Sequence, residues 1–242
     1  SSENIERSDF RNFTGYILKQ YEDIQSLEWI PRVPDYRREA YESAARREGL
    51  SVFQLTERIA QGKMKSAEKR KEYFPVYFVE PYKGNEIMLG FDLASDPTIR
   101  EAMEAAGKSG EIIAARKINL LGKATSEFSI AVFAPVYRGG ALLDSDKARW
   151  DNLEGLCAVV FSISSSVEES MSYLAPAGID FIIYDTSGPG KEELLYSHTS
   201  RARKTLMPDK ESETGPRLTK ILEVGGQKWT IIYSAAPEFV AA

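Results

Sequence analysis

Apolar residues near the N-terminus recur at steps of three and four, which is the spacing of an amphipathic helix. The apolar positions are Phe10, Phe13, Ile17, Tyr21, Ile24 and Leu27. Residues 4–28 contain no proline, whereas Pro31 and Pro34 force the residues before them into extended geometry. The pattern therefore predicts one long helix over residues 4–28. This helix serves as a core helix of a compact domain, as a rigid spine or as the seam of a dimer.

Two further helices and several strands are predicted up to residue 110. One helix covers residues 35–48, with Asp35 as its N-cap and Gly49 just past its end. Another begins at the cap Asp96 and continues to Ala106. Apolar runs predict strands at 52–55, 73–79 and 86–92, of which the last two form a hairpin. The polar residues 60–72 are interpreted as a solvated loop or a short helix.

The second half of the chain repeats this order of strands and helix. Strands are predicted at 112–113, 118–120, 128–137, 155–163, 180–184, 192–196, 217–224 and 228–233, with a loop at 138–149 and a helix at 166–174. A helix followed by meandering strands occurs in both halves. The fold class is therefore predicted to be α+β, with two small units in series and mostly antiparallel sheets.

The composition of the chain argues against several classes of function. Its 31 basic and 36 acidic residues give a net charge of −5, which argues against a nucleic-acid binder. One cysteine, Cys157, and one histidine, His198, form no internal disulfide and no thiolate or multi-histidine zinc site. No Gly-x-Gly-x-x-Gly motif follows a strand. We therefore expect neither a metal nor a cofactor, and interpret His198 as a loop or strand-end residue.

The sequence contains no stretch near the roughly 20 consecutive apolar residues that cross a bilayer, and no signal peptide. The chain begins Ser-Ser-Glu-Asn, without a methionine. We expect an excised segment whose flanking membrane helices lie outside it.

Asp92 is the strongest candidate for binding chemistry. It ends an apolar strand, so its carboxylate is expected to face a partly buried space and to need hydrogen-bond donors. Backbone N–H groups of the next helix are one source of donors, and an amine-bearing ligand is the other. Asp96, four residues later, is better explained as the helix cap.

Short motifs along the chain resemble the CHASE family of extracytoplasmic sensor domains. They are Leu27-Glu28-Trp29-Ile30-Pro31-Arg32-Val33-Pro34, Tyr41-Glu42, residues 46–49, Tyr73-Phe74-Pro75-Val76, Glu80-Pro81, Gly84-Asn85, Gly90-Phe91-Asp92-Leu93-Ala94-Ser95-Asp96-Pro97, Pro135-Val136-Tyr137 and Leu153-Glu154-Gly155. They follow the family's order and approximate spacing over residues 5–175.

The resemblance implies a two-unit receptor module between two membrane helices. A long N-terminal helix with its linker would cover residues 1–34, a membrane-distal PAS-like unit residues 35–163, and a membrane-proximal PAS-like unit residues 164–242. The distal unit would hold the ligand. The module would be the periplasmic or extracellular part of a membrane receptor, would form a homodimer through the N-terminal helix, and would signal to a cytoplasmic histidine kinase or cyclic-di-nucleotide enzyme.

The resemblance also implies binding residues. In the plant cytokinin receptors of this family an Asp that matches Asp92 binds the adenine edge. A backbone contact falls on Ala114, with Ile113 beside it, and the family's Thr-Gly appears as Ser109-Gly110. An apolar pocket with one carboxylate suits a cytokinin-like or other planar, amine-bearing ligand.

Candidate walls of such a pocket are the large side chains on strands expected to share one sheet face. These are Tyr77, Phe78, Met88, Phe133 and Tyr137, each of which ordinary core packing explains equally well. We predict a sensor without enzymatic activity. Two alternatives stay open: a small hydrolase that uses Asp92 or Asp96 as a base, and an interaction module whose helix 4–28 makes the interface.

Overall fold

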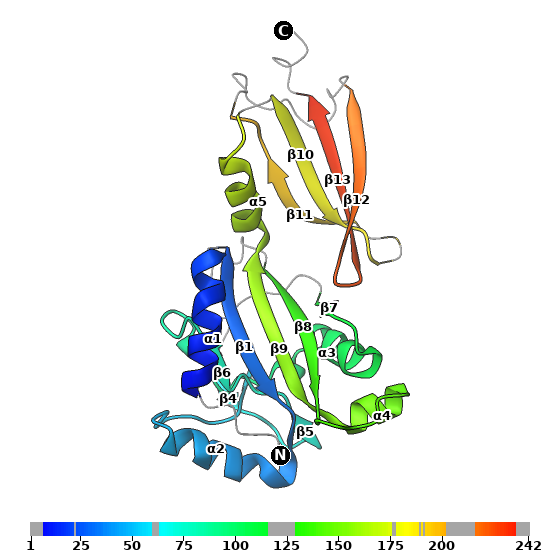
Figure 1. Ribbon diagram of the computed structural model, residues 1–242. Coiled ribbons are helices and arrows are strands. Elements are labelled where there is room, and N and C mark those ends of the chain that lie inside the picture. Colours follow the sequence, from blue (N-terminus) through cyan, green and yellow to red (C-terminus); the bar gives the residue numbers. More distant parts are fainter. Residues whose placement is uncertain are drawn as a thin grey trace. The chain divides into compact units, whose positions relative to one another are not determined.

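The computed structural model describes residues 7–21, 23–59, 63–115, 129–175, 178–188, 190, 192–201 and 216–235. The chain divides into two compact units, Ser1–Ser162 and Ile163–Ala242. The division lies one residue before the boundary expected between residues 163 and 164. Helices and antiparallel sheets occur in both units, so the predicted α+β class is confirmed (Figure 1).

The first unit is built on a five-stranded antiparallel sheet in the order β6-β1-β9-β8-β7. The strands are β1 (Ile24–Pro31), β6 (Phe78–Glu80), β7 (Ile113–Ala114), β8 (Ser129–Tyr137) and β9 (Leu153–Ser162). Two small two-stranded sheets accompany it: β2 (Val33–Pro34) with β5 (Glu72–Tyr73), and β3 (Thr56–Arg58) with β4 (Met64–Ser66). The strand β1 lies between β6 and β9, so both of its edges are paired.

The long N-terminal helix is the main correction to the sequence prediction. The helix α1 covers only Arg7–Gln20, and the residues that follow form β1. Ile24, Leu27 and Ile30 fit a helical stripe, but pairing on both edges gives the backbone of β1 hydrogen bonds from two neighbouring strands. Residues 24–31 therefore belong to the sheet of the first unit and not to a separate helix with its linker.

Other helices of the first unit agree more closely with the sequence. A 3-10 turn at Asp35–Arg37 leads into α2 (Arg38–Arg47), and α3 covers Pro97–Ser109. The side chain of Asp96 caps α3 by accepting from the backbone N–H groups of Thr98 at 2.9 Å and Ile99 at 3.3 Å. The predicted loop at 138–149 is wrong in part, because Ser145 caps a short helix α4 (Asp146–Asp151).

The predicted hairpin at 73–92 is correct only in part. Residues 74–76 pair antiparallel with residues 90–93 through backbone hydrogen bonds, but β6 pairs with β1. Residues Glu86–Met88 form a 3-10 turn and Leu93–Ser95 another, and the predicted strand 52–55 is displaced to β3. Gly90 explains part of this, since its φ of +78° breaks an extended strand and the carbonyl oxygen of Gln54 lies 2.1 Å from where a Cβ would stand. The predicted strand at 118–120 lies outside the described residues.

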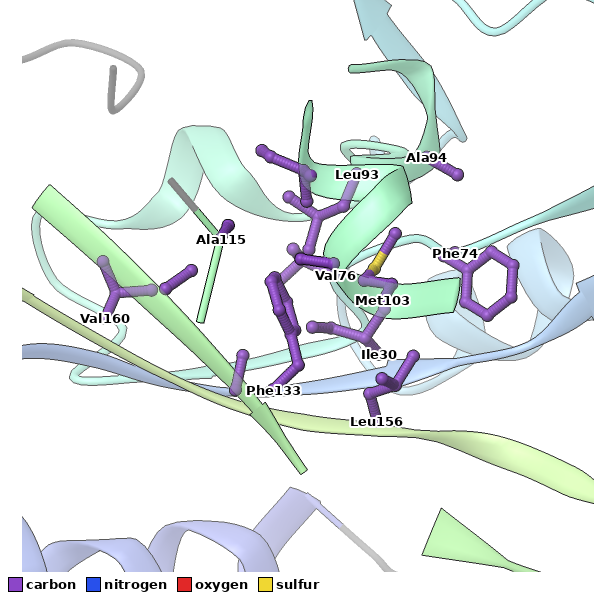
Figure 2. Packing of buried hydrophobic residues seen from close by; sticks show 14 of the residues in the cluster. Ile30, Phe74, Val76, Leu93, Ala94, Met103, Ala115, Phe133, Leu156 and Val160 are labelled. Carbon is purple, nitrogen blue, oxygen red and sulfur yellow. The ribbon is translucent and has the colours of Figure 1, made fainter. Parts of the chain in front are cut away.

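Two clusters of buried side chains form the core of the first unit. The α3 cluster lies between the sheet and α3, and Figure 2 shows Phe133 and Ile30 of the sheet next to Val76 and Met103. Its members are Ile30, Phe74, Val76, Val79, Met88, Phe91, Leu93, Ala94, Ile99, Ala102, Met103, Ala106, Ala115, Ala131, Phe133, Leu153, Leu156, Ala158 and Val160. The aromatic cluster consists of Val33, Ala45, Phe53, Leu55, Ala67, Tyr73, Tyr77 and Phe78, with Phe10, Trp29 and Tyr41 packed against it. Neighbouring residues of β1, such as Trp29 and Ile30, contribute to different clusters, because side chains alternate along a strand.

The second unit begins with α5 (Ile163–Ser172), which is followed by a four-stranded antiparallel sheet in the order β11-β10-β13-β12. Its strands are β10 (Ile179–Asp185), β11 (Glu193–His198), β12 (Arg217–Val224) and β13 (Gln227–Ala235). All four agree with the sequence prediction to within two residues. His198 is the last residue of β11, as expected, and stacks on Phe181 with ring centroids 4.8 Å apart.

Candidate functional site

Asp92 lies fully buried at the start of the turn Leu93–Ser95, where protein groups surround its carboxylate. Its Oδ1 accepts from the backbone N–H of Phe74 at 2.8 Å and of Ala94 at 3.3 Å. Its Oδ2 accepts from the Arg70 guanidinium at 2.7 Å. The donors that the sequence left open are therefore supplied here by two backbone groups and one cation.

Arg70 joins Asp92 to a second carboxylate. Its other Nη atom donates to Glu57, which also accepts from Lys65 at 3.1 Å and from the backbone N–H of Glu68 at 3.3 Å. Burial raises the pKa of Asp92 against the opposing effects of the Phe74 N–H and of Arg70. Burial also raises the pKa of Glu57. The hydrogen bonds from Lys65 and from the Glu68 N–H, together with the charge of Arg70, outweigh burial and leave the pKa of Glu57 lowered.

Each aspartate of the hydrolase alternative already has a structural role. Asp96 serves as the cap of α3, as the sequence predicted. Asp92 is bound to Arg70 and to the backbone on both of its oxygens. A general base needs an acceptor within reach of substrate, and both groups are engaged in holding local structure. This geometry does not favour the hydrolase.

The structure divides the predicted pocket walls between the two clusters. Met88 and Phe133 are buried in the α3 cluster, and the half-buried Tyr137 packs against it, its hydroxyl donating to the carbonyl of Gly107 at 3.0 Å. Tyr77 and Phe78 lie in the aromatic cluster instead, so the expectation of one common wall is wrong. The ring of Tyr77 stands 5.7 Å from that of Tyr41, and burial together with the charge of Glu48 raises the pKa of Tyr77 to about 12.

The positions inferred from the family's backbone contact lie at one end of the sheet. Ala114 is fully buried in β7, where it pairs with Val132. Ile113 is half-buried and packs against the α3 cluster. Ser109 is exposed at the end of α3, and its hydroxyl accepts from the backbone N–H of Glu111 at 3.1 Å. Ile113, which pairs with Phe133, thus adjoins the α3 cluster, whereas the side chain of Ala114 lies on the opposite face of β7 and Ser109 lies at the surface.

Two residues of this region were missed by sequence reasoning. Arg70 falls in a segment interpreted as solvated, and its partners lie 13 and 22 positions away, which no local pattern reveals. Glu28 falls inside the predicted N-terminal helix, whose pattern gives no sign that this side chain is buried. In the structure it lies on β1 and is almost completely buried, with the Ser26 hydroxyl donating to it at 2.9 Å.

Comparison with known proteins identifies the family. A family model described as CHASE domain matches residues 3–196, which is most of the chain. The chain belongs to the CHASE domain family. The match covers the whole described part of the first unit and continues into the second as far as β11.

Relatives of this CHASE domain include a signalling kinase. The chain is 24% identical over 237 residues to "Hybrid signal transduction histidine kinase A" of Dictyostelium discoideum, covering 90% of this chain and 11% of that protein. The CHASE domain thus spans about a tenth of the length of the curated relative it matches.

Two solved structures also resemble the CHASE domain. The ligand-binding domain of the Pseudomonas aeruginosa amino acid chemoreceptor PctC, solved with GABA, has 13% identity and a TM-score of 0.42, covering 96% of this chain and 82% of that one. "Methyl-accepting Chemotaxis protein X" has 10% identity and a TM-score of 0.46, covering 95% and 81%.

CHASE domains are extracellular sensor domains. Among the residues that the structure describes, no group of three or more His, Cys, Asp or Glu side chains is arranged to hold a metal ion. Within the same residues, no helix is both long and apolar enough to cross a bilayer.

Proposed function

We propose that this CHASE domain is the extracytoplasmic input module of a transmembrane receptor and binds a small molecule in its first unit without turning it over. The family match over residues 3–196 is the observation that carries the proposal. The hybrid histidine kinase relative supports an output through a cytoplasmic histidine kinase, with a cyclic-di-nucleotide enzyme as the alternative output. Signalling of this kind requires that the ligand binds two conformations with different affinity.

The ligand site in this proposal is the α3 cluster beside Asp92, in the membrane-distal PAS-like unit. Ile113, Met88, Phe133 and Tyr137 belong to or pack against this cluster and supply aliphatic and aromatic surface for a flat ring. Ala114, beside Ile113 on β7, contributes its backbone in this proposal. Tyr77 and Phe78 are excluded from the site because they pack in the aromatic cluster.

Asp92 contributes the polar contact in this proposal. An ionised carboxylate offers about four acceptor positions, and Phe74, Ala94 and Arg70 occupy three of them. The remaining position is available to an N–H group of a cytokinin-like or other planar, amine-bearing ligand. Arg70 then holds the Asp92 carboxylate in position and leaves one acceptor position to the ligand.

A ligand screen tests the sensor function. The whole chain is heated with a library of metabolites that includes amino acids, GABA, adenine and isopentenyladenine, and a stabilising compound is then titrated by calorimetry. We expect at least one compound to raise the melting temperature and to bind in a one-to-one complex. A library without any stabilising compound contradicts the sensor proposal.

A variant of Asp92 tests the site. We expect Asp92→Ala to weaken binding of the compound found in the screen at least about tenfold, because a hydrogen bond to a charged group is lost. The control Asp146→Ala, at the exposed start of α4, should leave affinity unchanged. Circular dichroism melts of both variants separate loss of binding from loss of fold. Unchanged affinity in a folded Asp92→Ala chain contradicts the role assigned to Asp92.

A further inference from the structure

Glu28 occupies a central position on the sheet of the first unit. Along β1 it stands opposite Val79 of β6 and Ala158 of β9. Val79 and Ala158 both belong to the α3 cluster, as does Ile30, two residues further along β1. Because side chains two apart on a strand share a face, the carboxylate of Glu28 points into the α3 cluster. Only 2% of the residue is exposed.

Glu28 is poorly supplied with donors compared with Asp92. Within the part of the chain that the structure describes, the Ser26 hydroxyl at 2.9 Å is its one hydrogen-bond donor, and Glu28 takes part in no ion pair. Asp92, in contrast, has a cation and two backbone N–H groups. A carboxylate with one hydroxyl donor leaves most of its acceptor positions unused, which is costly in an apolar core.

The side chains around Glu28 on this face cannot supply the missing donors. Its cross-strand neighbours, Val79 and Ala158, are aliphatic, and the next positions along β9 and β8 are Val160 and Ala131. The next hydroxyl on this face of β8, that of Ser129, donates to the Gln25 side-chain oxygen at 2.9 Å. A donor for Glu28 must therefore come from outside these strands.

We propose that Glu28, assisted by Ser26, is a ligand-binding carboxylate that accepts N–H bonds from the ammonium or amine group of a small molecule held against this face of the sheet. The inference rests on the proposed sensor function and adds to it the group that selects the ligand. A buried carboxylate recognises a cationic or N–H-bearing group strongly, because hydrogen bonds to a charged acceptor are about twice as strong as neutral ones.

The protonation of Glu28 is consistent with this role. Burial raises the pKa of Glu28 to about 7, and the Ser26 hydroxyl opposes this only in part. Near neutral pH the side chain is thus ready to ionise when a cation arrives.

Matched ligand pairs test the inference on the full chain. Adenine is compared with purine, and GABA with butyrate, because the members of each pair differ only in the amine group. Binding is measured by calorimetry for wild type, Glu28→Gln and the control Glu104→Gln, which removes a half-exposed glutamate of α3 that pairs with Lys108. Gln keeps the size of Glu but removes the anionic acceptor.

We expect wild type to bind the amine-bearing member of at least one pair about tenfold or more tightly than its partner. Glu28→Gln should abolish that preference without changing affinity for the partner lacking the amine, and Glu104→Gln should keep it. Glu28→Asp, which retains the charge on a shorter side chain, should retain part of the preference.

Several results overturn the inference while leaving the sensor function intact. A folded Glu28→Gln chain that keeps the amine preference is one. A second is a metabolite screen in which every stabilising compound lacks an N–H or ammonium group. A third is a set of matched pairs of which only the members lacking the amine bind. A screen without any stabilising compound overturns the sensor function itself, and the inference with it.

Discussion

Two buried carboxylates of the first unit, Asp92 and Glu28, differ in the groups that donate hydrogen bonds to them. Asp92 is held by Arg70 and two backbone N–H groups, whereas Glu28 has a single hydroxyl donor. The first arrangement resembles a structural ion pair, in which loss of one partner leaves an isolated buried charge. The second leaves a carboxylate ready for an external donor. The two residues are therefore expected to respond differently to substitution and to pH.

Removal of Arg70 should destabilise the fold through Asp92. Arg70→Met leaves the buried carboxylate without its cation, and we expect the free energy of unfolding at neutral pH to fall by about 3 kcal/mol. The loss should shrink as the pH falls and Asp92 becomes protonated. Urea unfolding at several pH values measures this. Lys69→Met, which removes a neighbouring cation that is 86% exposed, should have little effect, and equal losses in the two variants contradict the prediction.

Glu28 should make the stability of the wild type depend on pH. The pKa of Glu28 is about 7 in the folded chain and about 4.5 ordinarily, so the folded state binds the proton more tightly. The stability of the wild type should therefore fall as the pH rises from about 4.5 to about 7. Glu28→Gln lacks this loss, so its free energy of unfolding should rise by up to about 3 kcal/mol relative to that of wild type across this pH range. Parallel stability profiles of the two proteins contradict the assignment.

At the scale of elements, local signals predicted some structures well and failed at others. The helix α3 is encoded locally, since Asp96 caps it and Pro97 begins it. The strand β1 is not, because its apolar residues fit both a helix and a strand, and only pairing with β6 and β9 selects the strand. The partnership of Arg70 with Asp92 was equally hidden, because it spans 22 positions of sequence. The approach of Gly90 to Gln54 is a contact of the same long-range kind.

Gly90 should be much more sensitive to substitution than another glycine with positive φ. Gly90→Ala places a Cβ 2.1 Å from the backbone oxygen of Gln54, at a φ of +78°, and should cost more than about 2 kcal/mol. Gly84→Ala, at a φ of +92° in open space, should cost only about 1 kcal/mol of backbone strain. Denaturant unfolding of both variants measures the difference. Similar costs would show that the approach of Gln54 is unimportant.

At the scale of the whole molecule, the exposed surface of α1 suits the homodimer that the family resemblance leads us to expect. Phe13 and Tyr16 are 73% and 74% exposed, and their spacing of three places them on one face of the helix. Phe10 packs instead against Phe78, with ring centroids 5.6 Å apart. One side of α1 thus belongs to the aromatic cluster, and the aromatic rings on its other side suit a second copy of the chain.

Substitution of the exposed rings should weaken self-association. We expect the double variant Phe13→Ser and Tyr16→Ser to raise the dimer dissociation constant at least about tenfold in analytical ultracentrifugation. Tyr36→Ser removes an aromatic ring that is 85% exposed but lies outside α1, and should leave association unchanged. A wild-type chain that stays monomeric at high concentration contradicts dimerisation through α1.

The position of β1 directly after α1 gives the short connection between Gln20 and Ile24 a role in register. Along β1, Glu28 and Ile30 face the α3 cluster while Trp29 packs on the aromatic cluster. A deletion of one residue in this connection that slid β1 by one position would exchange the carboxylate and the indole between the two faces. The length of this connection should therefore be conserved among relatives as strictly as the identity of the residues that follow it.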